Sequence, residues 1–325
     1  MSAAVSCLLQ GNSVREGLSD AEIARAHASG TAPLWVDIDS RIDEQWRMLS
    51  EVFHFHPLPI EDTRSPHGRV KIEEYPGFLF MVVRETDFDA ATPDPYDLAF
   101  QNVCLFLGRS YVVTVHAGES PAIATVLDRV RAGADPLRGG ADHLAYQVLD
   151  SVVDHYFPLL DQIDAFVDDL EEHILGGARV VLDSVFHLRR TLAQLRRHVA
   201  PAREVMATLA NRPSPYLRPE TQVYFRDVYD HVVRELEAVE TYRDLLSGAM
   251  ETYFSVISNR MNEVIKVISI IGTVILPPTL IASIYGMNFR VMPLTQHSLG
   301  FWYALLMMTA VSVGFVWYLM WKRWM

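Results

Sequence analysis

Two long apolar runs dominate the C-terminal part of the chain. The first covers residues 264–284 and reads VIKVISIIGTVILPPTLIASI, and the second covers residues 301–321. Each is about as long as the roughly 20 residues that a helix needs to cross a bilayer core of about 30 Å. The pattern therefore predicts two transmembrane helices joined by an outer loop at residues 285–300.

A helical period precedes the first apolar run. From residue 141 onward, apolar positions recur at intervals of three and four residues. We expect three helices: residues 141–175, residues 180–211, and a helix that begins near Pro219. Gly176-Gly177 and the prolines at 213 and 215 separate them. Since no strong breaker follows Pro219, the third helix is expected to be a stalk continuous with the first transmembrane helix.

The first two of these helices carry opposite charges. The acidic face of the first consists of Asp161, Asp164, Asp168, Glu171 and Glu172, and the second carries Arg189, Arg190, Arg196, Arg197 and Arg203. Charges at helical spacing predict an antiparallel hairpin in which the two faces form ion pairs.

Residues 1–140 have the pattern of a mixed α/β domain. Strands rich in β-branched and aromatic residues are expected at Leu34–Ile38, Phe78–Arg84, Leu98–Leu107 and Tyr111–His116. Helices are expected at Asp20–His27, opened by Ser19, and at Ile42–Phe53, opened by Ser40. His54, His56, Glu61 and Asp62 cluster around two prolines without helical spacing, which favours turn and cap roles over a metal site.

Charge is distributed unevenly along the chain. The net charge is -12, and all 40 acidic residues precede residue 264. An acidic body attached to a membrane segment argues against nucleic acid as a partner and suits the handling of cations. Cys7 and Cys104 have neither CxxC spacing nor the number expected of a disulfide framework, and no signal peptide is evident.

The charges that flank the apolar runs predict the orientation. Arg260 and Lys266 lie at the first run and Lys322 and Arg323 follow the second, whereas the loop between the runs carries only Arg290. By the positive-inside rule, both termini are expected in the cytoplasm and the loop outside the cell (inner) membrane.

The residues between the two spans resemble a known family. Tyr285-Gly286-Met287-Asn288-Phe289 follows the first apolar run directly, and the stalk contains YFRDVYDH at residues 224–231. Together with residues 56–62 and 261–264, these segments resemble the CorA family of magnesium and cobalt transporters. The resemblance implies a homopentameric funnel that conducts divalent cations through the bilayer, with the selectivity filter at Gly286, Met287 and Asn288.

The expected fold is thus an α+β membrane protein with three parts. They are a cytoplasmic α/β domain at residues 1–140, a cytoplasmic helical hairpin and stalk at residues 141–262, and a membrane domain at residues 263–325. In the family, the acidic helices face the funnel, so a role in concentrating cations remains an alternative to the ion-paired hairpin.

Two spans of one chain cannot enclose an aqueous path, so transport requires a ring of subunits. One stripe of the first span would line its axis: Asn262, Ile265, Ile268, Gly272, Leu276 and Thr279. The polar members form rings at the two ends of the path, and Ile268 and Leu276 form apolar constrictions. The same spacing also occurs in ordinary helix packing, and the Gly-Met-Asn motif favours the pore.

An amide ring at the entrance suits a hydrated ion. Mg²⁺ gives up its bound waters reluctantly, and amide and carbonyl oxygens can accept hydrogen bonds from those waters without holding the ion too firmly. The outer loop departs from the family because Leu294 follows Met292-Pro293 where an acid is usual. A second departure is the doubled proline Pro277-Pro278, which is expected to kink the helix.

The resemblance also implies a regulatory magnesium site between subunits. It includes Asp227 on the stalk and an acid at the end of a strand, matched here to Asp89, although Asp87 could share the same strand face. Bound Mg²⁺ would offset the repulsion between the two carboxylates and hold a closed ring. The alternative is that Asp227 has no regulatory role and is a surface acid paired with an arginine of the stalk.

Two alternatives remain open. One is a Zn²⁺ transporter of the ZntB type, and the other is a membrane-anchored metal sensor without transport. An enzyme is disfavoured because the chain has no phosphate loop, no HExxH and no nucleophile elbow. No organic cofactor is expected, and the expected partners are divalent cations (Mg²⁺, Co²⁺, Ni²⁺ or Zn²⁺), the lipid bilayer and other copies of the chain.

Overall fold

The computed structural model divides the chain into two compact units, residues 1–250 and residues 251–325. It describes residues 4–11, 13–66, 68–133, 136–176, 181–288, 290, 292–294 and 297–322. Gly177, Val180, Phe289 and Arg323, which the sequence analysis names, lie outside the described residues.

The first unit contains a sheet of seven strands in the order β2-β1-β3-β7-β6-β5-β4. The strands are β1 (Val5–Gln10), β2 (Ser13–Glu16), β3 (Leu34–Asp39), β4 (Lys71–Tyr75), β5 (Phe78–Phe88), β6 (Leu98–Leu107) and β7 (Tyr111–His116). β3 and β7 pair in parallel, and the other neighbours pair antiparallel. A parallel pair needs a long crossover connection, and here the whole segment from α2 to β6 supplies it.

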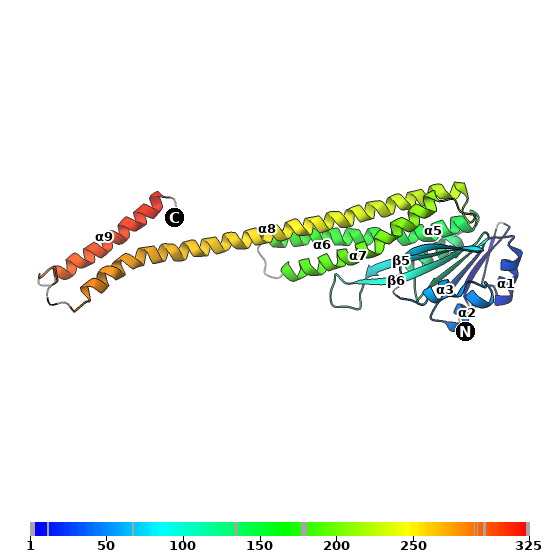
Figure 1. Ribbon diagram of the computed structural model, residues 1–325, viewed down its shortest axis with the longest axis horizontal. Helices are drawn as coiled ribbons and strands as arrows, with labels where there is room; N and C mark the ends of the chain where they lie inside the picture. The colour runs from blue at the N-terminus through cyan, green and yellow to red at the C-terminus, as the bar shows by residue number, and fades with distance from the viewer. Residues whose placement is uncertain are drawn as a thin grey trace. The chain divides into compact units, whose positions relative to one another are not determined.

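Helices cover both faces of this sheet (Figure 1). The helices of the described chain are α1 (Asp20–Ser29), α2 (Asp43–Glu51), α3 (Pro57–Asp62), α4 (Pro121–Arg131), α5 (Ala141–Asp154), α6 (Tyr156–Gly176), α7 (Val181–Asn211), α8 (Pro219–Tyr285) and α9 (Gly300–Trp321). Residues of α1, α2 and α3 bury an aromatic-rich core against one face, in which Phe55 stacks on Phe106 with ring centroids 4.2 Å apart. On the other face, α5 contacts β5, β6 and β7.

The four predicted strands are confirmed, and the first predicted helix is found as α1 with Ser19 at its N-cap. The cap role of His56 is also confirmed, since its side chain accepts a hydrogen bond from the Leu58 N–H at the start of α3. The predicted opening of α2 by Ser40 is wrong. Ser40 still extends the sheet by donating its N–H to the carbonyl of His116 (2.9 Å), so the helix begins only at Asp43.

The predicted helix at 141–175 is two helices. α5 ends at Asp154 and α6 begins at Tyr156, with His155 between them. Pro158 explains the break, because it lacks the N–H that would bond to the Asp154 carbonyl, and its ring clashes with that carbonyl in a continuous helix.

The ion pairs predicted between α6 and α7 are absent among the described residues. The sides of the two helices that pack inward are apolar, with Val167 and Leu170 on α6 and Leu188 and Leu192 on α7 all buried. Arg196 instead pairs with Glu240 of α8 at 2.5 Å. Packing of the apolar faces thus turns the charged faces elsewhere.

Helix α8 is continuous for 67 residues, as the absence of breakers predicts, and remains helical across Pro277 and Pro278. Phe225, Val228, Val232 and Val239 are buried at helical spacing within the first unit. The apolar windows of α8 and α9 have mean hydropathies of 2.1 and 1.7, with 0% and 6% of their residues buried. Two exposed apolar helices of this length need lipid or other helices around them.

Candidate functional site

The Gly-Met-Asn tripeptide forms the turn that ends α8. The Gly286 N–H donates to the Ala282 carbonyl (2.9 Å) and the Met287 N–H to the Ile284 carbonyl (3.2 Å), after which the helical hydrogen bonds stop. The side chains of Met287 and Asn288 are exposed. The tripeptide therefore presents backbone and amide groups at the end of an apolar helix.

The structure changes the reason for a glycine at position 286. A glycine at the end of a helix commonly adopts a left-handed conformation, but the φ of Gly286 is not in that region. A Cβ placed on Gly286 would lie 3.2 Å from the Ala282 carbonyl oxygen and 3.5 Å from that of Ser283. Close approach to these carbonyls, rather than a special dihedral angle, favours glycine here.

The predicted pore stripe lies along the exposed length of α8. Asn262, Ile265, Ile268, Gly272, Leu276 and Thr279 are all exposed in the single chain. The Thr279 hydroxyl donates to the Ile275 carbonyl at 2.8 Å, so its oxygen keeps its lone pairs free to accept. An acceptor without a free proton suits a hydrated cation, whose bound waters donate hydrogen bonds. Whether this stripe lines a pore stays a prediction.

The double proline frees two carbonyls beside this stripe. Pro277 and Pro278 have no N–H to donate to the carbonyls of Thr273 and Val274 four residues earlier. At membrane depth such carbonyls require another partner or water. We therefore expect water or another polar group to reach α8 near Thr273 and Val274.

A second group of polar side chains lies in the first unit, between α5 and α8. Asp150, Asp154 and His231 bring three possible ligand atoms within 4.8 Å of one another. His231 also lies 3.8 Å from Asp227, one turn earlier on α8. We call Asp150, Asp154 and His231 the stalk cluster. It is the one group of three metal-ligating side chains found among the described residues.

Burial gives the stalk cluster unusual electrostatics. Burial, and then the charge of Asp154, raise the pKa of the Asp150 carboxyl to about 6. Glu235, one turn beyond His231, is 1% exposed and neither of its carboxyl oxygens has a partner. Burial, followed by the charge of Asp154, raises the pKa of Glu235 to about 9. A cation at the cluster would relieve the repulsion that Asp150 and Asp154 exert on each other.

The sequence patterns did not lead us to predict the stalk cluster, although the spacing of its residues indicates that they share helix faces. Asp150 and Asp154 stand four residues apart, as do Asp227 and His231, so each pair lies on one helix face. What the sequence could not supply is the packing of α5 against α8.

The predicted partner of Asp227 lies in a turn. Asp89 directly follows β5; its Oδ1 accepts from the Ala91 N–H (2.9 Å), and its own N–H donates to the Asp97 carbonyl (2.9 Å). Asp87 is exposed within β5. Within one chain, no described hydrogen bond, ion pair or metal-ligating group joins Asp89 to Asp227. A site between subunits stays a prediction.

The alternative role of Asp227 was an ion pair with an arginine of the stalk. No such pair is present among the described ion pairs. Its partner is His231, and the Asp227 side chain is 66% exposed. The exposed carboxylate is thus available to a partner outside the chain.

Comparisons with known proteins agree with this architecture. A solved structure titled as the complete CorA magnesium transporter of Methanocaldococcus jannaschii has the same fold, with a TM-score of 0.85 and 21% identity, covering 100% of this chain and 99% of that one. The cobalt/magnesium transport protein CorA of Thermotoga maritima is 35% identical over 311 residues, which are 94% of this chain and 88% of that protein. The zinc transport protein ZntB of Yersinia pseudotuberculosis is more distant, with 21% identity over 301 residues, 92% of this chain and 90% of that protein.

A family model described as CorA-like Mg2+ transporter protein matches residues 31–323 and so includes strands β3 to β7, the stalk, both apolar helices and the tripeptide. The chain therefore belongs to the CorA-like family of divalent-cation transporters.

Proposed function

We propose that this protein conducts Mg²⁺, together with Co²⁺ and Ni²⁺, into the cell as a homopentamer, selecting the hydrated ion at rings of Gly286, Met287 and Asn288. The observation that carries the proposal is the exposed Gly-Met-Asn turn at the end of α8, between two helices long and apolar enough to cross a membrane. The cobalt/magnesium transport named for the Thermotoga relative supports the choice of ions.

The chemistry of the turn suits a hydrated divalent ion. Five Asn288 amide oxygens around an axis would accept hydrogen bonds from the bound waters, and the exposed carbonyls beneath them would add further acceptors. A carboxylate ring would hold the ion more firmly and slow its release. Deeper in the path, Ile268 and Leu276 would form apolar rings that close by losing their water.

Transport in this direction needs no chemical fuel. Two charges that move down a membrane potential of about 100 mV gain roughly 4–5 kcal/mol. This requires the orientation in which both termini face the cytoplasm, which the basic residues Arg260 and Lys266 support.

Ion-flux measurements on the purified protein in liposomes test the proposal. We expect uptake of Mg²⁺, Co²⁺ and Ni²⁺ that depends on an inside-negative potential. Uptake of Zn²⁺ that exceeds that of Mg²⁺ at equal concentration would favour the ZntB-type alternative. A membrane-anchored sensor would give no uptake of any of these ions above that of empty liposomes.

We further propose that cytosolic Mg²⁺ regulates the channel through Asp227. Its exposed carboxylate would share an ion with Asp89 of a neighbouring subunit, and the stalk cluster beside it would bind or attract a second ion. Bound ions would favour the closed ring only to the extent that they bind it more tightly than the open one. When Mg²⁺ falls, repulsion among these carboxylates would loosen the stalks.

Replacing both Asp89 and Asp227 by asparagine is expected to weaken this feedback. The Mg²⁺ concentration that halves the flux should rise at least about tenfold, since each tenfold step corresponds to about 1.4 kcal/mol of lost binding. Magnesium should also lose its protection of the soluble part against protease. Asp230→Asn, which removes an exposed acid from the same helix, serves as the control and should behave like the wild type. Unchanged inhibition and protection in the double variant would exclude these two residues as the sensor.

A further inference from the structure

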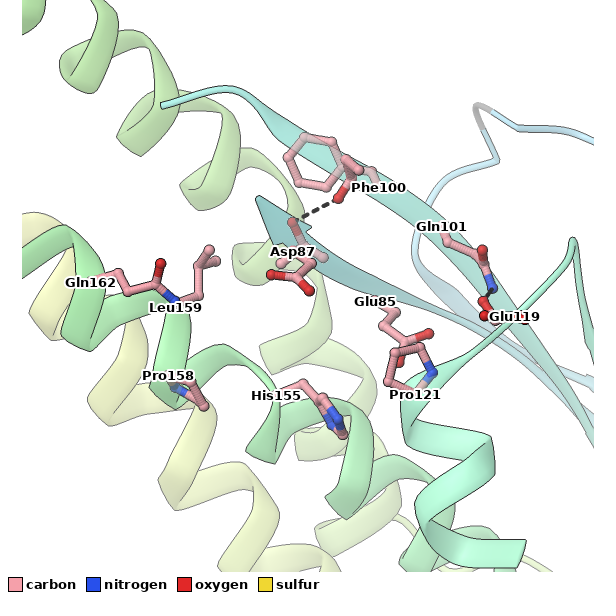
Figure 2. Close-up of a pocket in the computed structure, with 12 residues that line it drawn as sticks. Glu85, Asp87, Phe100, Gln101, Glu119, Pro121, His155, Pro158, Leu159 and Gln162 are labelled. Carbon is pink, nitrogen blue, oxygen red and sulfur yellow. Dashed lines mark hydrogen bonds between the residues drawn. The ribbon is translucent and has the colours of Figure 1, made fainter. Parts of the chain in front are cut away.

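A cavity of about 290 Å³ lies in the first unit, and the three residues of the stalk cluster are not among those that line it. Its residues come from β5 and β6, from the turn before α4, and from the junction of α5 and α6 (Figure 2). The helix is interrupted at His155, between α5 and α6. This interruption places Pro158 and Leu159 in the cavity wall. Its volume lies near the lower end of the range for small-molecule pockets, roughly 300–1,000 Å³.

The wall and the rim of the cavity differ in character. Phe100, Pro158 and Leu159 supply apolar surface, whereas Glu85, Asp87 and Glu119 supply carboxylates, and no lysine or arginine is among the described residues that line the cavity. Figure 2 shows the Glu85 and Asp87 side chains reaching from β5 toward the helices that carry His155 and Leu159. The cavity is therefore apolar on one side and negatively charged on the other.

Internal contacts use only part of this charge. Glu85 is buried, and its carboxylate accepts from the Ser120 hydroxyl (2.8 Å) and the Ala122 N–H (2.7 Å) at the start of α4. Among the described hydrogen bonds, the Asp87 carboxylate accepts from the adjacent Phe88 N–H (2.7 Å) through one oxygen. Arg41, whose guanidinium lies beside Gly118, is bound by Asp39 at 2.7 Å. The charge of Arg41 also acts on Glu119, and the carboxylates of Asp87 and Glu119 are both exposed and can contact a cationic ligand.

The spacing of these carboxylates argues against a bare metal ion. Among the described residues, only the stalk cluster brings three ligand atoms of His, Cys, Asp or Glu within 4.8 Å, so the acids of the cavity and His155 do not form such a group. Separated negative charges beside apolar surface instead suit a molecule whose positive charges are separated by hydrocarbon.

We propose that this cavity binds a linear aliphatic polyamine. Its methylene groups would pack on Phe100 and Leu159, and its ammonium groups would reach Asp87 and Glu119, forming charge-assisted hydrogen bonds. The ligand would join the end of β5 to the α5–α6 junction, next to Asp154 of the stalk cluster. Its binding does not depend on the transport activity proposed above.

Calorimetric titration of the full-length protein in detergent with spermidine tests this site. We expect one spermidine per chain, at an ionic strength matched with sodium chloride. The double variant Asp87→Asn, Glu119→Gln should bind about tenfold more weakly or worse, because it loses hydrogen bonds to charged groups. The control variant Asp20→Asn, Glu51→Gln removes the same charge from exposed positions elsewhere in the first unit and should bind as the wild type does.

A third variant separates the cavity from diffuse attraction to an acidic protein. Gln162→Trp places a bulky group at the exposed rim without changing the charge, and it should weaken spermidine binding to a similar extent. Thermal melting of each variant in the absence of ligand verifies that it folds. The proposal is overturned by absence of spermidine binding, by equal weakening in the control variant, or by unchanged binding in Gln162→Trp. Displacement of spermidine by MgCl₂ at matched ionic strength from wild type but not from the Asp87, Glu119 variant would identify a metal site instead.

Discussion

Alanine at position 288 is expected to reduce selective divalent-cation uptake to the level of empty liposomes. The Asn288 side chain is exposed at the end of α8 and contributes little to packing within the chain. Its removal should therefore leave folding and assembly intact while it deletes, in every subunit, the amide that accepts hydrogen bonds from the ion's waters.

Uptake of Mg²⁺ and Co²⁺ into proteoliposomes, with size-exclusion chromatography of the same sample, measures this effect. Ser298→Ala is a matched control because it removes an exposed polar side chain from the same loop and leaves the Gly-Met-Asn tripeptide unchanged; it should retain uptake. Wild-type flux and selectivity in the Asn288→Ala protein would show that Asn288 does not contact the ion.

The second large effect concerns the carboxyl of Glu235. This side chain is 1% exposed and has no hydrogen-bond partner for either oxygen, and its pKa is raised from 4.5 to about 9. The folded protein thus holds this proton more tightly than the unfolded chain does. At a pH below about 4.5, Glu235 is protonated in both the folded and the unfolded chain, so its ionisation does not lower the free energy of unfolding. As the pH rises from about 4.5 to about 9, only the unfolded chain releases the proton freely, and the folded state loses stability.

Glutamine at position 235 should therefore stabilise the protein in a pH-dependent way. It resembles the protonated acid but cannot ionise, so the gain should be small at pH 5 and on the order of several kcal/mol at pH 8. Melting temperatures measured in EDTA between pH 5 and 9 test this. Glu237→Gln, an exposed acid on the same helix, is the control and should shift the melting temperature little at any pH. A gain at position 235 that is equal at pH 5 and pH 8 would show that the carboxyl is not held neutral.

The acid at 235 also bears on the regulatory proposal. It lies one turn beyond His231 on the stalk, and the charge of Asp154 contributes to its raised pKa. A group that is neutral at physiological pH adds no negative charge to the packing between α5 and α8. Under the regulatory proposal, the charges expected to respond to cations there are accordingly those of Asp150, Asp154 and Asp227.

Local patterns predicted the elements of this protein well. Strands β6 and β7 have the expected limits, α8 runs without a break to Tyr285, and α9 lies at the second apolar run. These features depend on residues near one another in the chain: period-two or helical spacing, a sufficiently long apolar run, and prolines or glycines at the ends. Pro158 is also a local signal, and it accounts for the break between α5 and α6 within the single helix predicted at residues 141–175.

The sequence by itself thus determined the two membrane helices, the stalk, and the exposed Gly-Met-Asn turn between the apolar runs. Only the tertiary structure decided which charges lie together. Asp150 and His231 are 81 residues apart and meet because α5 packs on α8, and Glu235 differs from the exposed Glu237 only in the side of α8 that it occupies. The described ion pairs include none between the arginines of α7 and the acids of α6, because the sides on which the two helices pack are apolar. Burial and proximity follow from which faces pack together, and that choice minimises apolar exposure over the whole fold rather than within any one segment.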